Sequence, residues 1–343
     1  MRRDGLAMQK QVTLLQSRPI MKSGNWLSAA LVLAVAYGCE VACAADYPSR
    51  PLRLVMANAP GSSADTIGRI VAARLGEALG QQIVVDNRAG AGGVVGMEIG
   101  KNAIPDGYTL LATSYGALTV LPHIRKNLPY DPMNDFEYVA LYSRQGNVLV
   151  VNPALPVKSV KELIEYAKAR QGKLNMATTG VGAQSHLNGA ALMLAGKFES
   201  VHVPYKGGGP SMAAVIANEA QWSIAPSGAM MSHVRAGRLR AIGHTLPQRS
   251  PLLGDIPAIA ETLPGFRHIA FSGFLAPKGT PRPVMQKINA TVARVIATPE
   301  LKEQLALQGA EPATGTPEEF RRGVWEVLVE TGKLVKAIGL KDE

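Results

Sequence analysis

Aromatic residues and cysteines are both scarce in this sequence of 343 residues. Phe, Trp and Tyr make up 5% of it, and the two cysteines, Cys39 and Cys43, lie close together near the N-terminus. Hydrophobic residues nevertheless make up 47% of the chain, which argues against disorder. The sequence is rich in glycine (35) and proline (23), a balance that favours an α/β protein with many short, turn-rich connections.

Several motifs that would indicate catalysis or a cofactor are missing. The six histidines form no HxxxH, HExxH or Cys/His set, so we expect no metal site. The glycine run Gly90–Gly96 has the spacing GxGxxxG and does not open the first βαβ unit, so we expect no dinucleotide cofactor. A hydrolase using Ser185 and His186 would need a GxSxG elbow, which is lacking. We therefore expect no enzyme, and keep an exported α/β hydrolase only as a remote alternative.

The N-terminus has the pattern of an export signal. Lys22 precedes an apolar stretch, residues 26–38, and a small-x-small cleavage signature follows at Ala42-Cys43-Ala44. The stretch is too short to span a bilayer comfortably. A lipoprotein signal ending at Cys39 is an alternative, although Ala36 and Glu40 fit it less well. We predict a cleaved signal peptide over residues 1–44 and a periplasmic protein.

Cleavage there would remove both cysteines, so the mature chain would depend on its core rather than on disulfides. It would also remove five basic and two acidic residues, leaving a net charge of about +7 in place of +10. These charges are scattered along the sequence, which favours long-range attraction of anionic solutes over nucleic-acid binding.

A strand, a Gly- or Ser-rich turn and a helix start follow one another three times. The three units have their strands at 52–57, 174–178 and 201–203, their turns at 60–65, 180–186 and 204–210, and their helices ending near 79, 194 and 218. Further strands and helices alternate between and after them. Such alternation predicts largely parallel sheets with helices on both faces.

Two segments could cross between lobes, one near 138–147 and the other near 271–277. We therefore expect the first part of lobe 1 at 45–145, lobe 2 at 146–272 and a return segment of lobe 1 at 273–343. Two crossings make a hinge, and a cleft between lobes is a natural ligand site.

The turns provide groups suited to an anion. Ser62 and Asp65 have the spacing of a capping box, which would leave the amides of residues 61–63 at the positive end of a helix. The turns that contain Ser185 and Gly207 offer similar amides and hydroxyls, so a shared anion cradle is favoured over three unrelated caps. Two readings stay open for Lys206, which either pairs with a carboxylate or is solvated. His186 is better read as a packed or helix-start residue.

With these turns in view, the chain resembles the Bug family, the substrate-binding proteins of tripartite tricarboxylate transporters, from about Tyr47 to about Leu340. The resemblance lies in ordered blocks: Pro60-Gly61 with Asp65 and Arg69, VDNRAGAGG at 85–93, PDGYTLL at 105–111, LPYDP at 128–132 with Asp135-Phe136, HVPYKG at 202–207 and APKGTP at 276–281.

The resemblance implies a two-lobed Venus-flytrap fold of the type II periplasmic-binding class, each lobe a sheet flanked by helices. In the family, two ordered waters and backbone groups hold one ligand carboxylate near the first and third turns. Carried over by motif, the ligand-binding residues would be Pro60, Gly61, Ser62, Ser63, Asp65, Ser114, Ser185, His186, Tyr205, Lys206 and Gly207.

The sequence departs from the family pattern in ways that bear on the ligand. Ser62 replaces a usual glycine and adds a hydroxyl at the carboxylate site, and Phe271 replaces a usual Trp. The segment Trp222–Ser227 lacks the acidic residue often found there, so we expect a ligand other than an amino acid.

The expected function is capture of a small carboxylate by a monomeric protein that hands it to membrane permease subunits. A sensor module that feeds a receptor kinase is the alternative, and the sequence does not separate the two.

Overall fold

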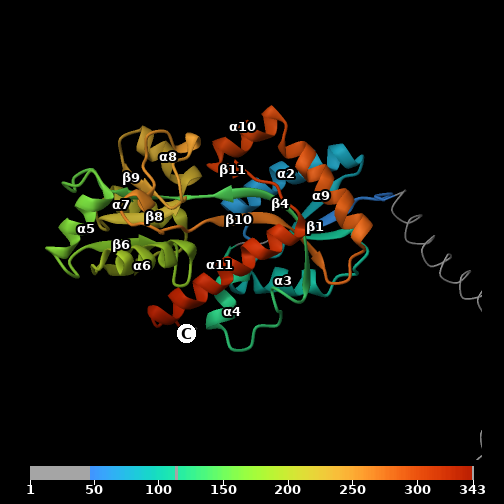
Figure 1. Cartoon of the computed structure of the whole chain (residues 1–343), viewed down its shortest axis with the longest axis horizontal. Coiled ribbons are helices and arrows are strands. Elements are labelled where there is room, and N and C mark those ends of the chain that lie inside the picture. The colour runs from blue at the N-terminus through green and yellow to red at the C-terminus, as the bar shows by residue number, and fades with distance from the viewer. Residues whose placement is uncertain (1–46, 113–114, 342–343) are drawn as a thin grey trace, which may run out of the picture. The chain divides into compact units, whose positions relative to one another are not determined.

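The computed structural model describes residues 47–112 and 115–341. The predicted signal peptide and Ser114 therefore lie outside the described residues. The described chain forms two β-sheets, each flanked by helices, as the two-lobed α/β expectation requires (Figure 1). None of the helices in these ranges has the length and apolar character needed to cross a bilayer.

The first sheet has six strands in the order β11-β4-β10-β3-β1-β2. They are β1 (Leu52–Met56), β2 (Ile83–Asn87), β3 (Thr109–Ala112), β4 (Phe136–Gln145), β10 (Ala270–Pro277) and β11 (Ala310–Pro312). β1 pairs in parallel with β2 and β3, whereas β10 and β11 run antiparallel to their neighbours.

The second sheet has five strands in the order β7-β6-β8-β5-β9. They are β5 (Asn147–Val151), β6 (Asn175–Thr178), β7 (Val201–Pro204), β8 (Trp222–Pro226) and β9 (Arg240–His244). β6 pairs in parallel with β7 and β8, and β5 is antiparallel to β8 and β9.

Both sheets are thus mixed, and the expectation of largely parallel sheets is wrong. The reason is the crossing between lobes. β4 passes directly into β5 of the other sheet, with only Gly146 between them, and the chain returns through β10. Parallel neighbours need a crossover connection within one sheet, usually a helix, and these passages between the sheets provide none.

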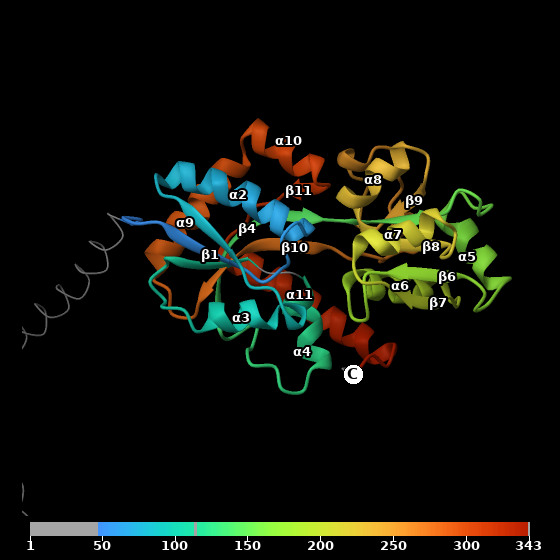
Figure 2. The ribbon, with the colours of Figure 1, turned by 180° about the vertical axis from the view of Figure 1, so that it is seen from behind.

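Helices cover both faces of the two sheets. Around the first sheet and its hinge these are α2 (Ser63–Leu79), α3 (Val94–Lys101), α4 (Leu121–Ile124), α9 (Arg282–Ile296), α10 (Pro299–Leu307) and α11 (Pro317–Ala337), with short turns η1 (Ala91–Gly93) and η2 (Gly116–Val120). Around the second they are α5 (Val160–Lys168), α6 (Gln184–Gly196), α7 (Gly208–Ile216) and α8 (Ser227–Arg235), with η3 (Pro251–Leu253) and η4 (Ile259–Glu261). Figure 2 shows the same arrangement from behind.

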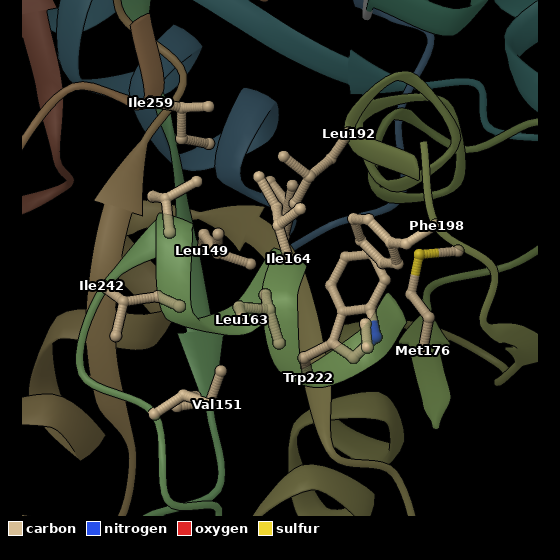
Figure 3. Close-up of a cluster of buried hydrophobic side chains, with 14 of the residues drawn as sticks. Leu149, Val151, Leu163, Ile164, Met176, Leu192, Phe198, Trp222, Ile242 and Ile259 are labelled. Carbon is tan, nitrogen blue, oxygen red and sulfur yellow. The ribbon is translucent and has the colours of Figure 1, made fainter. Parts of the chain in front are cut away.

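The second sheet has a core on each face, and β5 shows how the sequence builds both. All five β5 residues are buried, and successive side chains point to opposite faces. Leu149 and Val151 join α5, α6 and Trp222 in one core, drawn in Figure 3. Val148 and Val150 join residues of α7 and α8 in the other. A strand buried on both faces reads as a continuous apolar run, as this one does.

Candidate functional site

A cleft of about 550 Å³ lies at the junction of the two sheets, and both contribute residues to it. The starts of α2, α3 and α6 reach it, as do residues of the crossing strands. Its lining residues are Ala57, Asn58, Ala59, Ser62, Ser63, Ala64, Ala89, Gly90, Gly92, Gly93, Tyr115, Gly116, Val120, Leu121, Ile124, Gln145, Thr179–Ser185, Pro226, Ala270, Phe271 and Ser272.

The start of α2 presents free backbone donors to the cleft. Ser62 is the N-cap, and its Oγ accepts from the Asp65 amide at 3.3 Å. That bond satisfies one of the N–H groups that every helix start leaves without an intrahelical acceptor. Among the described residues, no protein group accepts from the amides of Ser63 and Ala64, which line the cleft. They are suited to bind an anion at the positive end of the helix.

Asp65 lies behind this start, buried, and holds the first turn in shape. Its carboxylate accepts hydrogen bonds from the Gly61 amide (2.9 Å), from Asn87 Nδ2 (2.8 Å) and from Arg69 Nε (3.0 Å). Burial acts to raise the pKa of Asp65, but these donors outweigh it and the pKa lies below its ordinary value. Asp65, Pro60 and Gly61 are absent from the cleft lining itself.

The start of α6 forms the facing part of the cleft. Its N-cap, Ala183, provides no side-chain cap, and among the described residues nothing accepts from the amides of Gln184 and Ser185. Ser185 Oγ accepts from the Thr179 amide at 2.9 Å and lies 3.0 Å from Thr179 Oγ1, which closes the turn. Gly180 and Gly182 take positive φ angles of 134° and 72°.

His186 points away from the cleft, although it follows Ser185 directly. Its Nδ1 accepts from the Gly182 amide at 3.1 Å, and its ring stacks on His202 with centroids 3.8 Å apart. Burial, and the neighbouring His202, lower the pKa of His186 to about 4. His186 lines a separate open groove beside α6 and the end of α11. It supports the second turn from behind and does not pair with Ser185 as a catalytic base would.

The third predicted turn lies beside the second but outside the cleft lining. The Tyr205 amide donates to Thr178 O at 2.9 Å, and the Tyr205 side chain packs against the core that contains Val215. Lys206 is exposed, and Gly207, with φ of 107°, caps α7. The structure therefore brings Ser62, Ser63 and Ser185 together at one cleft and leaves Tyr205, Lys206 and Gly207 at its margin.

The glycine-rich loop Gly90–Gly93 lines the cleft, where the third turn was expected. Gly90, Gly92 and Gly93 line the cleft at the start of α3. α3 can lie close to Ala57 because Gly96 has no Cβ. A Cβ at this position would stand 2.6 Å from the Cα of Ala57. The structural role of the GxGxxxG spacing is close packing of backbone beside the cleft.

The crossing strands add a polar clamp that the sequence did not single out. Ser63 Oγ donates to Gln145 Oε1 at 3.2 Å, and Gln145 Nε2 donates to Gln308 O at 3.1 Å. Gln145 is the last residue of β4. Its position in the segment expected to cross between lobes is the sequence signal that could have identified it. On β10, Ala270, Phe271 and Ser272 also reach the cleft.

Of the remaining lining residues, Asn58, Gln184 and Ser272 have polar side chains, and Asn58 Oδ1 and Gln184 Nε2 are buried without a hydrogen-bond partner among the described residues; the others are apolar. We name as the apolar wall the side chains of Tyr115, Val120, Leu121, Ile124, Val181 and Phe271. Across the cleft lining, the structure describes no Asp, Glu, Lys, Arg or His. Within the described residues no cluster of three or more His, Cys, Asp or Glu side chains is placed to hold a metal ion. The cleft is therefore equipped to bind an anion through backbone dipoles and hydroxyls.

Comparison with known proteins agrees with this geometry. The model of the tripartite tricarboxylate transporter family receptor matches residues 67–340. The chain belongs to this family. Protein BugT of Bordetella pertussis is 33% identical to it over 297 residues, which cover 86% of this chain and 91% of BugT. The family is one of substrate-binding receptors, not of catalysts.

Solved structures of similar proteins share the fold. Rpa4515 of R. palustris, solved with adipate, has a TM-score of 0.78 and 31% identity, covering 86% of this chain and 99% of that one. MatC of Rhodopseudomonas palustris, with bound malate, has a TM-score of 0.73 and 29% identity, covering 84% and 100%. The Bug-family resemblance read from the sequence is confirmed.

Proposed function

We propose that this receptor captures a small organic carboxylate in the cleft and delivers it to the membrane permease subunits of a tripartite transporter. The observation that carries the proposal is the pair of helix starts, α2 and α6, whose free amides reach one cleft, and no charged side chain is found in the part of its lining that the structure describes. Helix N-termini bind anions without a basic residue, and they release them without breaking a buried ion pair. The adipate and malate complexes of the two related receptors support a carboxylate as ligand.

Several expectations from the sequence become part of this proposal. The chain is exported with a cleaved signal peptide at 1–44 and acts in the periplasm as a monomer. Its lobes, 45–145 with 273–343 and 146–272, close on the ligand about the crossing strands. The amides of Ser63, Ala64, Gln184 and Ser185 hold the carboxylate. Ser62, Pro60 and Gly61 shape the first turn, Tyr205 to Gly207 complete the rim, and Ser114 stays a predicted ligand contact.

A thermal-shift screen tests the capture of carboxylates. The purified protein is scanned with mono- and dicarboxylates, each paired with its uncharged primary amide. A ligand at 100 times its dissociation constant adds about 2.7 kcal/mol to the free energy of unfolding. We expect a rise in melting temperature with at least one acid and none with its amide. Equal shifts with acid and amide, or no shift with any acid in a folded protein, would contradict the proposal.

Two variants of Ser63 separate its amide from its hydroxyl. Ser63 occupies the first helical position, where proline fits, and Ser62 has the extended backbone that precedes proline well. Both Ser63→Pro and Ser63→Ala lose Oγ, but only Ser63→Pro loses the N–H. We expect Ser63→Pro to bind the acid found in the screen about tenfold more weakly than Ser63→Ala, because a hydrogen bond to a charged group contributes about 1.5–3 kcal/mol. Equal affinities of the two variants would show that the amide is not a ligand.

A further inference from the structure

Two side-chain amides in the cleft lining each have a buried atom without a hydrogen-bond partner. They are Asn58, which follows β1 just ahead of the first turn, and Gln184, the first residue of α6. Among the described residues, no donor reaches Asn58 Oδ1 and no acceptor reaches Gln184 Nε2. Buried polar atoms in proteins are nearly always paired, so an unpaired one requires an explanation. We name these two side chains the amide pair.

Other polar side chains around the two helix starts are already engaged. Ser63 Oγ donates to Gln145 Oε1 at 3.2 Å, and Ser185 Oγ accepts from the Thr179 amide at 2.9 Å. Those bonds hold the turns in shape. The amide pair holds nothing comparable within the described chain, because its buried atoms make no hydrogen bond there. Its position in the lining makes a bound ligand the natural partner.

The backbone around each amide is fixed, whereas the amide itself can turn. Asn58 O accepts from Asn87 Nδ2 at 3.0 Å, and the same nitrogen donates to Asp65, so residue 58 is tied to the first turn. Gln184 directly precedes Ser185 at the start of α6. Both side chains of the amide pair are half-buried, and the torsion next to a side-chain amide is soft. Either amide can therefore rotate toward a ligand while the helix starts stay in place.

The chemistry of the amide pair favours a hydroxyl as the ligand group. Asn58 Oδ1 is an acceptor and lacks a donor, whereas Gln184 Nε2 is a donor and lacks an acceptor. A hydroxyl can donate to the first and accept from the second. An ammonium serves only Asn58, and a second carboxylate serves only Gln184. Moreover, the described lining contains no charged side chain that would neutralise either of these ions.

We propose that the amide pair recognises a hydroxyl on the body of the ligand, so that the receptor prefers hydroxylated carboxylates to the parent acids that lack the hydroxyl. This inference rests on the proposed function, because the helix starts must hold the carboxylate for the hydroxyl to reach Asn58 and Gln184. A hydroxylated acid supplies the partners that both buried atoms lack. A parent acid leaves both atoms unpaired in the closed cleft.

The test compares acids that share a skeleton. Isothermal titration is carried out with propionate and lactate, with succinate and malate, and with cyclohexanecarboxylate and shikimate. We expect the hydroxylated member of at least one pair to bind about fivefold or more tightly than its parent. A smaller ratio in every pair overturns recognition of the hydroxyl while leaving carboxylate capture intact. No binding of any acid, by folded protein, overturns both.

The aminated acids alanine and aspartate complete the series. We expect them to bind more weakly than lactate and malate, because an ammonium cannot accept from Gln184. Tighter binding of both aminated acids would overturn the hydroxyl as the recognised group.

Apolar replacements of similar size test the amide pair itself. Asn58→Leu and Gln184→Met remove the polar atoms, and Gln184→Met keeps the backbone N–H that we propose as a carboxylate donor. For the pair of acids with the largest ratio, we expect each variant to lower that ratio at least threefold. The melting temperature of the ligand-free protein should not fall, because the buried atoms that are removed had no partner.

Asn188, one turn further along α6, provides the matched control. Its side chain is fully buried, and both of its polar atoms lack a partner among the described residues, yet it is not part of the cleft lining. We expect Asn188→Leu to leave the ratio unchanged. An equal fall in Asn188→Leu would overturn direct recognition by the amide pair. A ratio that persists in folded Asn58→Leu or Gln184→Met would overturn the role of that side chain.

Discussion

At the scale of single residues, Asp65 shows how a ligand cleft can rely on a carboxylate that never faces it. Its side chain is 4% exposed and joins the first turn to Asn87 at the end of β2. A carboxylate at the cleft surface would repel an anionic ligand. Asp65 instead lies behind the helix start, where Arg69 neutralises its charge. Its hydrogen bonds hold the first turn so that the amides of the helix start face the cleft.

Replacing Asp65 by alanine should therefore destabilise the fold. The change leaves the Gly61 amide without its acceptor and removes one of the two acceptors of Asn87 Nδ2, and an unsatisfied buried group costs about 1–3 kcal/mol. We expect the free energy of unfolding, measured with urea, to fall by about 2 kcal/mol. Glu77→Ala removes another carboxylate of α2, which is 65% exposed and pairs with Arg74. That control should change stability by about 0.5 kcal/mol or less, and an equal loss in both variants would refute the role of Asp65.

His186 makes the stability of the second turn dependent on pH. The folded-state pKa of about 4 lies below the ordinary value of 6.5, so the unfolded chain takes up a proton first as the pH falls. The free energy of unfolding should therefore decline between about pH 6.5 and pH 4.

His186→Asn tests this dependence. Asparagine can still accept from the Gly182 amide but does not titrate, so the decline from pH 7 to pH 4.5 should be shallower than in the wild type. At pH 8, where neither form is charged, the difference between the two proteins measures the lost stacking on His202. A decline as steep as that of the wild type would exclude His186 as its source.

At the scale of elements, the segment that joins α10 to β11 is bonded to the start of α8, which flanks the second sheet. Ser227 Oγ, at the start of α8, donates to Gly309 O at 2.9 Å, and a Cβ on Gly228 would meet Gln308 O at 2.4 Å. Gln145 bonds to the same segment. The contact thus connects α8, β11 and the clamp that reaches Ser63 in the cleft.

Gly309→Ala should break this contact. Gly309 has φ of 66°, and a Cβ there would stand 2.2 Å from Ser227 Oγ. Gly237 has a similar φ of 69° and nothing within 4 Å, so Gly237→Ala measures the backbone cost alone, about 1 kcal/mol or more. We expect Gly309→Ala to lower the free energy of unfolding by at least 1 kcal/mol more than Gly237→Ala. Equal losses would mean that the α8 contact can shift without cost.

At the scale of the whole described unit, two strands carry the chain between the sheets and the cleft lies where they cross. β4 ends at Gln145 and β5 begins at Asn147, while β10 starts at Ala270 beside the cleft. Such an arrangement concentrates bending in a few residues at element ends.

Ligand binding should therefore make the protein more compact. We expect a saturating concentration of the best acid to lower the radius of gyration in small-angle X-ray scattering, because closure brings the α2 and α6 starts onto the carboxylate. Ser63→Pro, at the same acid concentration, should show a smaller decrease. An unchanged radius with wild-type protein that is shown by titration to be saturated would contradict closure.

Much of the local structure is determined by the sequence alone. Apolar residues at helical spacing predict α2 to its end at Leu79, where the structure also ends it. Local signals suffice there because caps and periodicity act within a few residues. The start of α7 at Gly208 was missed because a helix beginning with glycines has little intrinsic propensity and depends on its packing against the second sheet.

Which turns share a cleft was decided by the tertiary structure. The three turns look equivalent in sequence, yet strand order places the α2 and α6 starts opposite each other with the Gly90–Gly93 loop, and leaves Tyr205 to Gly207 at the margin. The apolar wall and Gln145 come from segments far apart in the chain, so no local pattern could assemble them. The sequence determined that Gly- and Ser-rich turns would precede helix starts with free amides suited to an anion. Only the packing of two mixed sheets decided what surrounds the anion, because that depends on contacts between distant residues.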